Sequence, residues 1–306
     1  MIFNSTRKWI YRNARPLEFA LWQFLFENGS QDAVVEMLMH YQNEDGGFGH
    51  ALEADSWNPA SKPITTNHAI KILSMIGFDD ISHPVHQGIQ KYLLSEKDLL
   101  NNGWPFTIPS NDDFPHAPWW NYSEEQNERE HYGVTAGLTA YVLKYLSPEK
   151  SVYQKAQKFA EQMIHFLGDD ISYGDMGLEG MIYLVETLES LGNYEYDYEL
   201  LYDKLREKVT QAIEHDTDKW KYYSVRPSYY IRTPNSKFYV GNEEIVKKEL
   251  EYLVNTHPQN DVWGITWTWF ENMDKFEKYF TISENWWKAS KAIENILFLR
   301  NFSCLN

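Results

Sequence analysis

The stretch QNEDGGFG, residues 42–49, separates two segments of helical character and decides the fold. Residues 31–42 lead into it with the apolar periodicity of an amphipathic helix. Three glycines in four positions allow positive φ angles and end that helix. Residues 65–77 are predicted to form a second helix, with Thr65 or Thr66 as its N-cap and Gly77 at its end. The sequence therefore predicts a helical hairpin around a glycine-rich loop.

The same unit recurs along the chain. Each copy has a charged helix, a loop that carries Gly or Asp and an aromatic residue, and an apolar helix rich in small residues. We expect an all-α protein, an α/α toroid of about five or six helical hairpins in one domain over residues 1–306; an open solenoid shows the same alternation. The further copies are 84–95 with 131–146, 151–167 with 177–191, 197–215 with the aromatic segment around Trp220, and 242–256 with 284–302.

The composition excludes several classes of partner. A formal charge of -16 repels phosphate backbones and anionic lipid, so neither nucleic acid nor a membrane surface is expected. A small neutral or cationic ligand suits this charge better. The aromatic fraction of 16% is high enough that rings are expected to line a cavity as well as fill a core. Cys304 is the one cysteine, which excludes an intrachain disulfide and a thiolate-rich metal site.

The N-terminal region superficially matches a secretory signal, because basic residues precede an apolar run over residues 17–26. Glu18 and Gln23 interrupt that run and no small-residue cleavage site follows, so an amphipathic first helix is the better interpretation. The chain has no uninterrupted apolar stretch of about 18 residues, and no membrane span is expected. We expect a cytoplasmic protein, and the sequence predicts no particular number of subunits.

The first hairpin resembles the terpenoid cyclase and protein prenyltransferase superfamily of α/α toroids. The resemblance rests on residues 42–49, followed by the Thr-Thr-x-x-Ala pattern of residues 65–69, with weaker copies at residues 102–104 and 260–264. It implies a closed ring, a glutamine that caps helix ends, and an isoprenoid or similar apolar ligand. The chain lacks the Asp-x-Asp-Asp acid and the complete Asp-Asp-x-x-Asp motif of those enzymes, and Cys304 is badly placed to bind zinc. The resemblance thus speaks for the fold more than for the reaction.

The segment HALEADSWNP, residues 50–59, carries the main catalytic candidates. Glu53 and Asp55 lie two positions apart, and we expect them to act as a proton donor and its partner, one with a raised pKa. His50 and Asp45 are the other catalytic candidates in this region. The alternative is that the two acids cap a helix and that the rest is a solvated loop.

The candidate binding residues lie on other loops and at helix starts. Residues 112–121 hold two prolines and two tryptophans, which is typical of a rigid wall or lid; an insertion packed on the rim is the alternative. Each histidine, acid and aromatic ring also has a structural explanation, as a core, cap or packing residue. The substrate-binding candidates are Trp57, His68, His116, Trp119, Trp120, His131, Tyr132, Asp175, Glu179, Trp263 and Trp267.

Three functional hypotheses follow. The first is a terpenoid cyclase-like or prenyltransferase-like enzyme that transforms an isoprenoid in an aromatic, acidic cavity by general-acid chemistry. The second is a carbohydrate-processing (α/α) barrel, a glycoside hydrolase or a sugar epimerase, because Trp rings stack on sugars and carboxylates or histidines do the chemistry. The third is a non-catalytic binding protein. No metal and no cofactor is expected in any of the three. An apolar lumen favours the first hypothesis and a wet groove with carboxylates the second.

Overall fold

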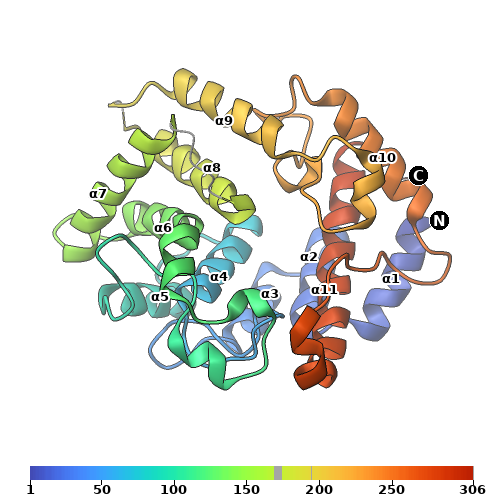
Figure 1. Ribbon diagram of the computed structural model, residues 1–306, viewed down its shortest axis with the longest axis horizontal. Coiled ribbons are helices and arrows are strands. Elements are labelled where there is room, and N and C mark those ends of the chain that lie inside the picture. The colour runs from blue at the N-terminus through green and yellow to red at the C-terminus, as the bar shows by residue number, and fades with distance from the viewer. Residues whose placement is uncertain (169–173, 194, 306) are drawn as a thin grey trace. The chain divides into compact units, whose positions relative to one another are not determined.

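The computed structural model describes residues 1–168, 174–193 and 195–305 (Figure 1). In this part of the chain the secondary structure consists of eleven α-helices and short 3₁₀ turns, and β-structure is limited to isolated bridges. The all-α prediction is therefore confirmed. The chain divides into two compact units, one made of Met1–Met37 and Val209–Asn306 and the other of Leu38–Lys208. We call them unit 1 and unit 2; a single domain stays a prediction.

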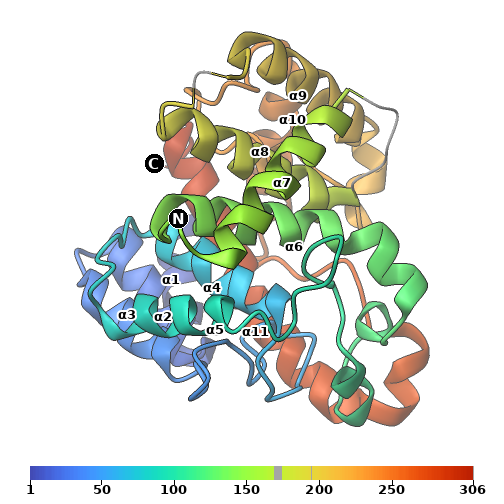
Figure 2. The ribbon, with the colours of Figure 1, turned by 90° about the vertical axis from the view of Figure 1, so that its left-hand side faces the viewer.

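The described residues of unit 2 contain five complete helices. They are α4 (Pro63–Met75), α5 (Pro84–Leu94), α6 (Glu124–Tyr145), α7 (Ser151–Phe166) and α8 (Gly174–Ser190). Helix α6 packs against α4, α7 and α8, as the ribbon views show (Figures 1 and 2), and α5 contacts α7. Most residues of α4, of α8 and of α6 from His131 onward are buried, whereas fewer than half of the residues of α5 and of α7 are buried. The two kinds of helix alternate along the chain, as the repeat predicts.

Small residues account for the close approach of α6 and α8. A Cβ atom added at Gly180 would lie 2.5 Å from the backbone oxygen of Gly133, and one added at Gly133 would lie equally close to the oxygen of Met176. Backbone atoms of the two helices therefore meet at a distance that leaves no room for a side chain. The small residues of these two helices thus allow their backbones to pack closely.

Local sequence signals explain most helix ends in unit 2. Pro63 and Pro84 stand in the first turns of α4 and α5, where a missing backbone N–H costs nothing. Ser123 caps α6 by accepting a hydrogen bond from the backbone of Gln126. The predicted cap at Thr65 or Thr66 was wrong, because α4 already begins at Pro63 and both threonines are buried within it.

Unit 1 contains α1 (Ile2–Asn13), α2 (Pro16–Phe26), α10 (Glu243–Thr256) and α11 (Met273–Asn301). Helices α3 (Gln31–Met39) and α9 (Tyr198–Ala212) each cross from one unit to the other along the chain. Helix α11 packs against α1 and α2. The buried carboxylate of Glu18 accepts hydrogen bonds from Arg15 at 2.6 Å and from Ser290 of α11 at 3.3 Å, which ties α2 to α11.

No described helix is both long enough and apolar enough to cross a membrane.

Candidate functional site

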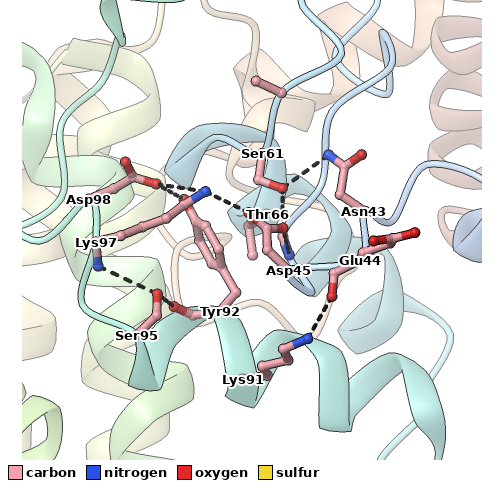
Figure 3. Close-up of polar contacts among 12 residues, drawn as sticks. Asn43, Glu44, Asp45, Ser61, Thr66, Lys91, Tyr92, Ser95, Lys97 and Asp98 are labelled. Carbon is pink, nitrogen blue, oxygen red and sulfur yellow. Dashed lines mark hydrogen bonds and ion pairs between the residues drawn. The ribbon is translucent and has the colours of Figure 1, made fainter.

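The loop between residues 43 and 62 is held at its base by a polar network around Asp45 (Figure 3). The Asp45 carboxylate accepts hydrogen bonds from Ser61 at 2.5 Å, from Lys97 at 2.5 Å and from the backbone of Gly47 at 3.1 Å. Partial burial opposes ionisation of Asp45, but these donors outweigh it and lower its pKa. Asp45 thus joins the two ends of the loop to each other and to the segment after α5. Its predicted catalytic role stays a prediction beside this structural one.

Two further contacts fix the base of the loop. The Gln42 amide donates to the backbone oxygens of Gly46 at 2.9 Å and of Val85 in α5 at 3.0 Å, which ties the loop to the next hairpin. Gly46 has a φ of 93°, and a Cβ atom there would collide with the backbone of α5. The first hairpin therefore specifies glycine at this position for both conformation and space.

The backbone of the loop is strained at residues 50 and 51. His50 and Ala51 have φ angles of 54° and 56°, a left-handed conformation that side chains with a Cβ rarely adopt. Such residues persist where the surrounding structure holds them, and they concentrate at functional sites. His50 itself is exposed and bonds to Asn43 at 2.8 Å, so it reaches back to the base of the loop. The two strained residues lie just before Glu53 in the chain.

The loop also pairs with the second candidate segment, residues 112–121. The backbone of Trp57 donates to Pro115 at 2.9 Å, and Ala117 donates to the backbone oxygen of Asp55 at 2.9 Å. His116 and Trp120 are buried: His116 bonds to the Asn121 side chain at 2.6 Å, and the Trp120 ring stacks on Phe106. These contacts favour the alternative interpretation of residues 112–121 as a packed insertion, which buttresses the loop. The backbone of Trp119 accepts from Gln126 of α6, while its ring is half-buried.

Glu53 and His68 form the accessible polar pair of the loop. The Oε2 atom of Glu53 lies 3.3 Å from Nδ1 of His68, which projects from α4. The side chains are 12% and 31% exposed, so His68 reaches solvent and Glu53 lies largely behind it. Within the described residues, Nε2 of His68 has no hydrogen-bond partner. A carboxylate at Nδ1 fixes the tautomer that leaves Nε2 able to accept a proton.

Lys62 lies at the foot of α4 and was not found by sequence reasoning. Its side chain is only 1% exposed, and its ammonium nitrogen donates to Oγ of Ser56 at 2.6 Å. Burial lowers the pKa of Lys62 to about 7, although the nearby charge of Glu53 opposes that shift. A lysine next to a proline at a helix start carries no signal of burial, so nothing in the sequence marked it.

A second ion pair lies one turn further along α4. Lys71 of α4 contacts Glu179 of α8 at 2.5 Å, and both side chains are partly exposed. Residues three apart share a helix face, so His68 and Lys71 present their polar ends on the same side of α4. Together with Glu53 and Glu179 they form what we call the α4 polar strip. Asp55, by contrast, is 2% exposed, so the structure pairs Glu53 with His68 at the accessible face.

The remaining candidates lie elsewhere. His131 and Tyr132 are on α6 and line a small pocket with residues of α7. Trp263 and Trp267 belong to unit 1, where the Trp263 ring nitrogen donates to the backbone of Leu253 and the Trp267 ring packs edge-on against Trp287. The side chain of Asp175 lies outside the described residues.

Comparison of the chain with protein-family models, curated proteins and solved structures gave no match. The site therefore has to be interpreted from its own geometry.

Proposed function

We propose that this protein is a carbohydrate-processing enzyme of the epimerase or isomerase type, with His68 as its general base. The single observation that carries the proposal is the contact between Glu53 and Nδ1 of His68, in which the histidine is 31% exposed. The carboxylate holds the ring in one tautomer and stabilises the imidazolium that forms when Nε2 takes a proton. Long hydrogen bonds of this kind are common in enzymes without substrate and shorten when substrate binds.

The α4 polar strip supports a saccharide over an isoprenoid. Lys71 and Glu179 lie one turn from His68 and carry opposite charges. Sugar hydroxyls donate to carboxylates and accept from ammonium groups, whereas a hydrocarbon chain would remove these charges from water without replacing their hydrogen bonds. Trp57, half-buried on the same loop as Glu53, offers a ring on which a sugar can stack. The isoprenoid ligand implied by the family resemblance remains the rival hypothesis.

Proton transfer at carbon fits the strip better than glycoside hydrolysis. Hydrolysis needs two carboxyl groups that flank the scissile bond, about 5 to 10 Å apart. Glu53 is engaged with His68, and Asp55 is buried. In the proposed reaction, His68 removes the proton on the carbon next to the carbonyl of an open-chain sugar. The ammonium of Lys71 stabilises the enediolate oxygen. His68 then delivers the proton to the former carbonyl carbon, while a proton passes from the hydroxyl oxygen of the neighbouring carbon to the former carbonyl oxygen, so that an aldose becomes a ketose.

The α/α toroid is the architectural part of this proposal. It is supported by the alternation of α4, α6 and α8 with α5 and α7 in unit 2, and by the resemblance of the first hairpin to such rings. In a toroid, the loops after the outer helices face the mouth of the ring. The loop that carries Glu53 follows α3 and precedes α4, which agrees with such a position.

The test is deuterium exchange at carbon, followed by proton NMR in D₂O over a panel of aldoses, ketoses and N-acetylated sugars. We expect the wild type to exchange the proton next to the carbonyl of at least one sugar. His68→Gln should slow the exchange at least about 100-fold, in the range typical of a lost general base. His40→Gln is the matched control, because His40 is an exposed histidine of the same unit. Absence of exchange with every sugar would refute the proposal, and turnover of an isoprenoid diphosphate would establish the rival.

A further inference from the structure

A small pocket in unit 2 lies apart from the α4 polar strip. Its volume is about 110 Å³, and it is formed between α6, α7 and the turn before Trp104. Its floor consists of the buried side chains of His131, Thr135, Phe159 and Met163. Exposed Asn102 and Gln162 stand at its mouth, so the pocket opens to solvent. None of these residues belongs to the loop of residues 43–62.

The hydrogen bonds of Thr135 fix the tautomer of His131. The Thr135 hydroxyl oxygen accepts from the backbone N–H of Trp104 at 3.0 Å, and its hydrogen points to the backbone oxygen of Trp104 at 3.4 Å. The 3.3 Å contact between Nδ1 of His131 and Thr135 is then satisfied only if Nδ1 carries the hydrogen, because the hydroxyl has one donor and two acceptor sites. Nε2 of His131 is consequently a hydrogen-bond acceptor.

That acceptor faces no protein donor. Within the part of the chain that the structure describes, Nε2 of His131 makes no hydrogen bond, although the residue is buried. One face of the imidazole is covered by Tyr132, whose ring centre lies 4.3 Å away. Burial also lowers the pKa of His131, which keeps the imidazole neutral near pH 7. Nε2 is accessible from the open pocket, so a ligand that displaces water there has to donate a hydrogen bond to Nε2 or leave it without one.

We propose that this pocket binds a single planar ring of phenol size that donates one hydrogen bond to Nε2 of His131. The volume limits the ligand to one ring, because about 110 Å³ is less than the roughly 150 Å³ of an apolar cavity that encloses benzene, so part of the ring would lie in the open mouth of the pocket. The lining sets the chemistry, because Phe159 and Met163 give ring and sulfur contacts to an aromatic molecule. The tautomer requires a hydroxyl or another N–H or O–H donor on that ring. This site is independent of the proposed epimerase activity.

The probes are 4-fluorophenol and fluorobenzene, titrated against the full chain and followed by fluorine NMR. We expect a dissociation constant of about 1 mM or tighter for 4-fluorophenol, a reasonable affinity for a ligand of this size. Fluorobenzene should bind about 3- to 10-fold more weakly, since it lacks one hydrogen bond. His131→Leu should remove this preference, whereas His40→Leu, at an exposed histidine, should preserve it. Equal binding of both probes to the wild type, or no binding of either, would overturn the proposal.

A second measurement keeps the test decisive if His131→Leu fails to fold. At equal occupancy of the pocket, the nitrogen-15 resonance of His131 Nε2 in the wild type should shift much more with 4-fluorophenol, which donates a hydrogen bond to it, than with fluorobenzene. A resonance that responds to neither probe overturns the proposal without any variant.

Discussion

Replacement of Lys62 by methionine gives the most direct test of the electrostatics at the foot of α4. The change keeps the length and approximate volume of the side chain and removes its charge. The pKa of Lys62 is about 7 in the folded chain and 10.5 in the reference state. The unfolded chain therefore binds this proton more tightly, and folding carries a cost that is full below pH 7 and disappears as the pH rises toward 10.5.

The size of the cost follows from the two pKa values. It is about 4 to 5 kcal/mol at pH 6 and about 1 kcal/mol at pH 10. The methionine variant avoids this cost but loses the hydrogen bond to Ser56 and leaves that buried hydroxyl without its donor, a loss of about 2 kcal/mol. We expect Lys62→Met to be more stable than the wild type by about 2 to 3 kcal/mol at pH 6, and less stable by about 1 kcal/mol at pH 10.

Urea unfolding of both proteins at several pH values measures this crossover. The difference between variant and wild type cancels the titration of all other groups. Because the chain has two compact units, the unfolding of unit 2 should be followed by its own backbone amide signals. Carbon-13 labelling of lysine side chains measures the pKa of Lys62 directly, with the variant providing the assignment. A stability difference that does not change with pH, or a Lys62 resonance that titrates near pH 10, would refute the reasoning.

Two further predictions concern the hydrogen bonds of Asp45 and the contact between α6 and α8. Asp45→Asn should destabilise unit 2 by about 1 to 2 kcal/mol at pH 7. The ion pair with half-exposed Lys97 is screened by solvent and contributes little, and the hydrogen bond from Ser61 is weakened. Because the folded state lowers the pKa of Asp45, the loss of stability should disappear in urea titrations below about pH 4, and an undiminished loss at pH 2 would contradict this prediction. Gly180→Ala should cost about 1 to 3 kcal/mol despite the better helix propensity of alanine, because its Cβ would meet the Gly133 backbone. An alanine variant at position 180 that melts higher than the wild type would show that α6 and α8 are not in this contact.

The helical repeat could be predicted because its signals are local. The glycines of residues 46–49 and the prolines at helix starts set the backbone conformation of their own segments. The small residues of α6 and α8 are visible in the composition of each helix, although they act between the two helices. The period of apolar residues then distinguishes the alternating helices. What failed locally was the N-cap of α4, where Pro63 started the helix two residues earlier than the threonines suggested.

The site was harder to predict, because burial depends on residues far apart in the chain. Glu53 and His68 were each singled out from the sequence, but their contact was not, since fifteen residues and a strained loop separate them. Lys62 was missed because a lysine is ordinarily exposed. His116 and Trp120 are expected to bind a ligand, but both are buried and His116 bonds to Asn121 of its own segment, so their binding role stays a prediction. Composition and spacing indicate which chemistry is available, and only packing decides which groups reach solvent.

The loop of residues 43–62 combines features that each oppose folding. His50 and Ala51 have a left-handed backbone conformation. Lys62 lies in the same loop, and its burial costs several kcal/mol at neutral pH. The network of Asp45, together with Gln42 and the backbone bonds to residues 115–117, holds this loop in place. A protein under selection for stability alone would replace Lys62 with an apolar residue. The charge of Lys62 interacts with that of Glu53, the partner of the partly exposed His68, and this is the physical reason that we propose chemistry at this loop.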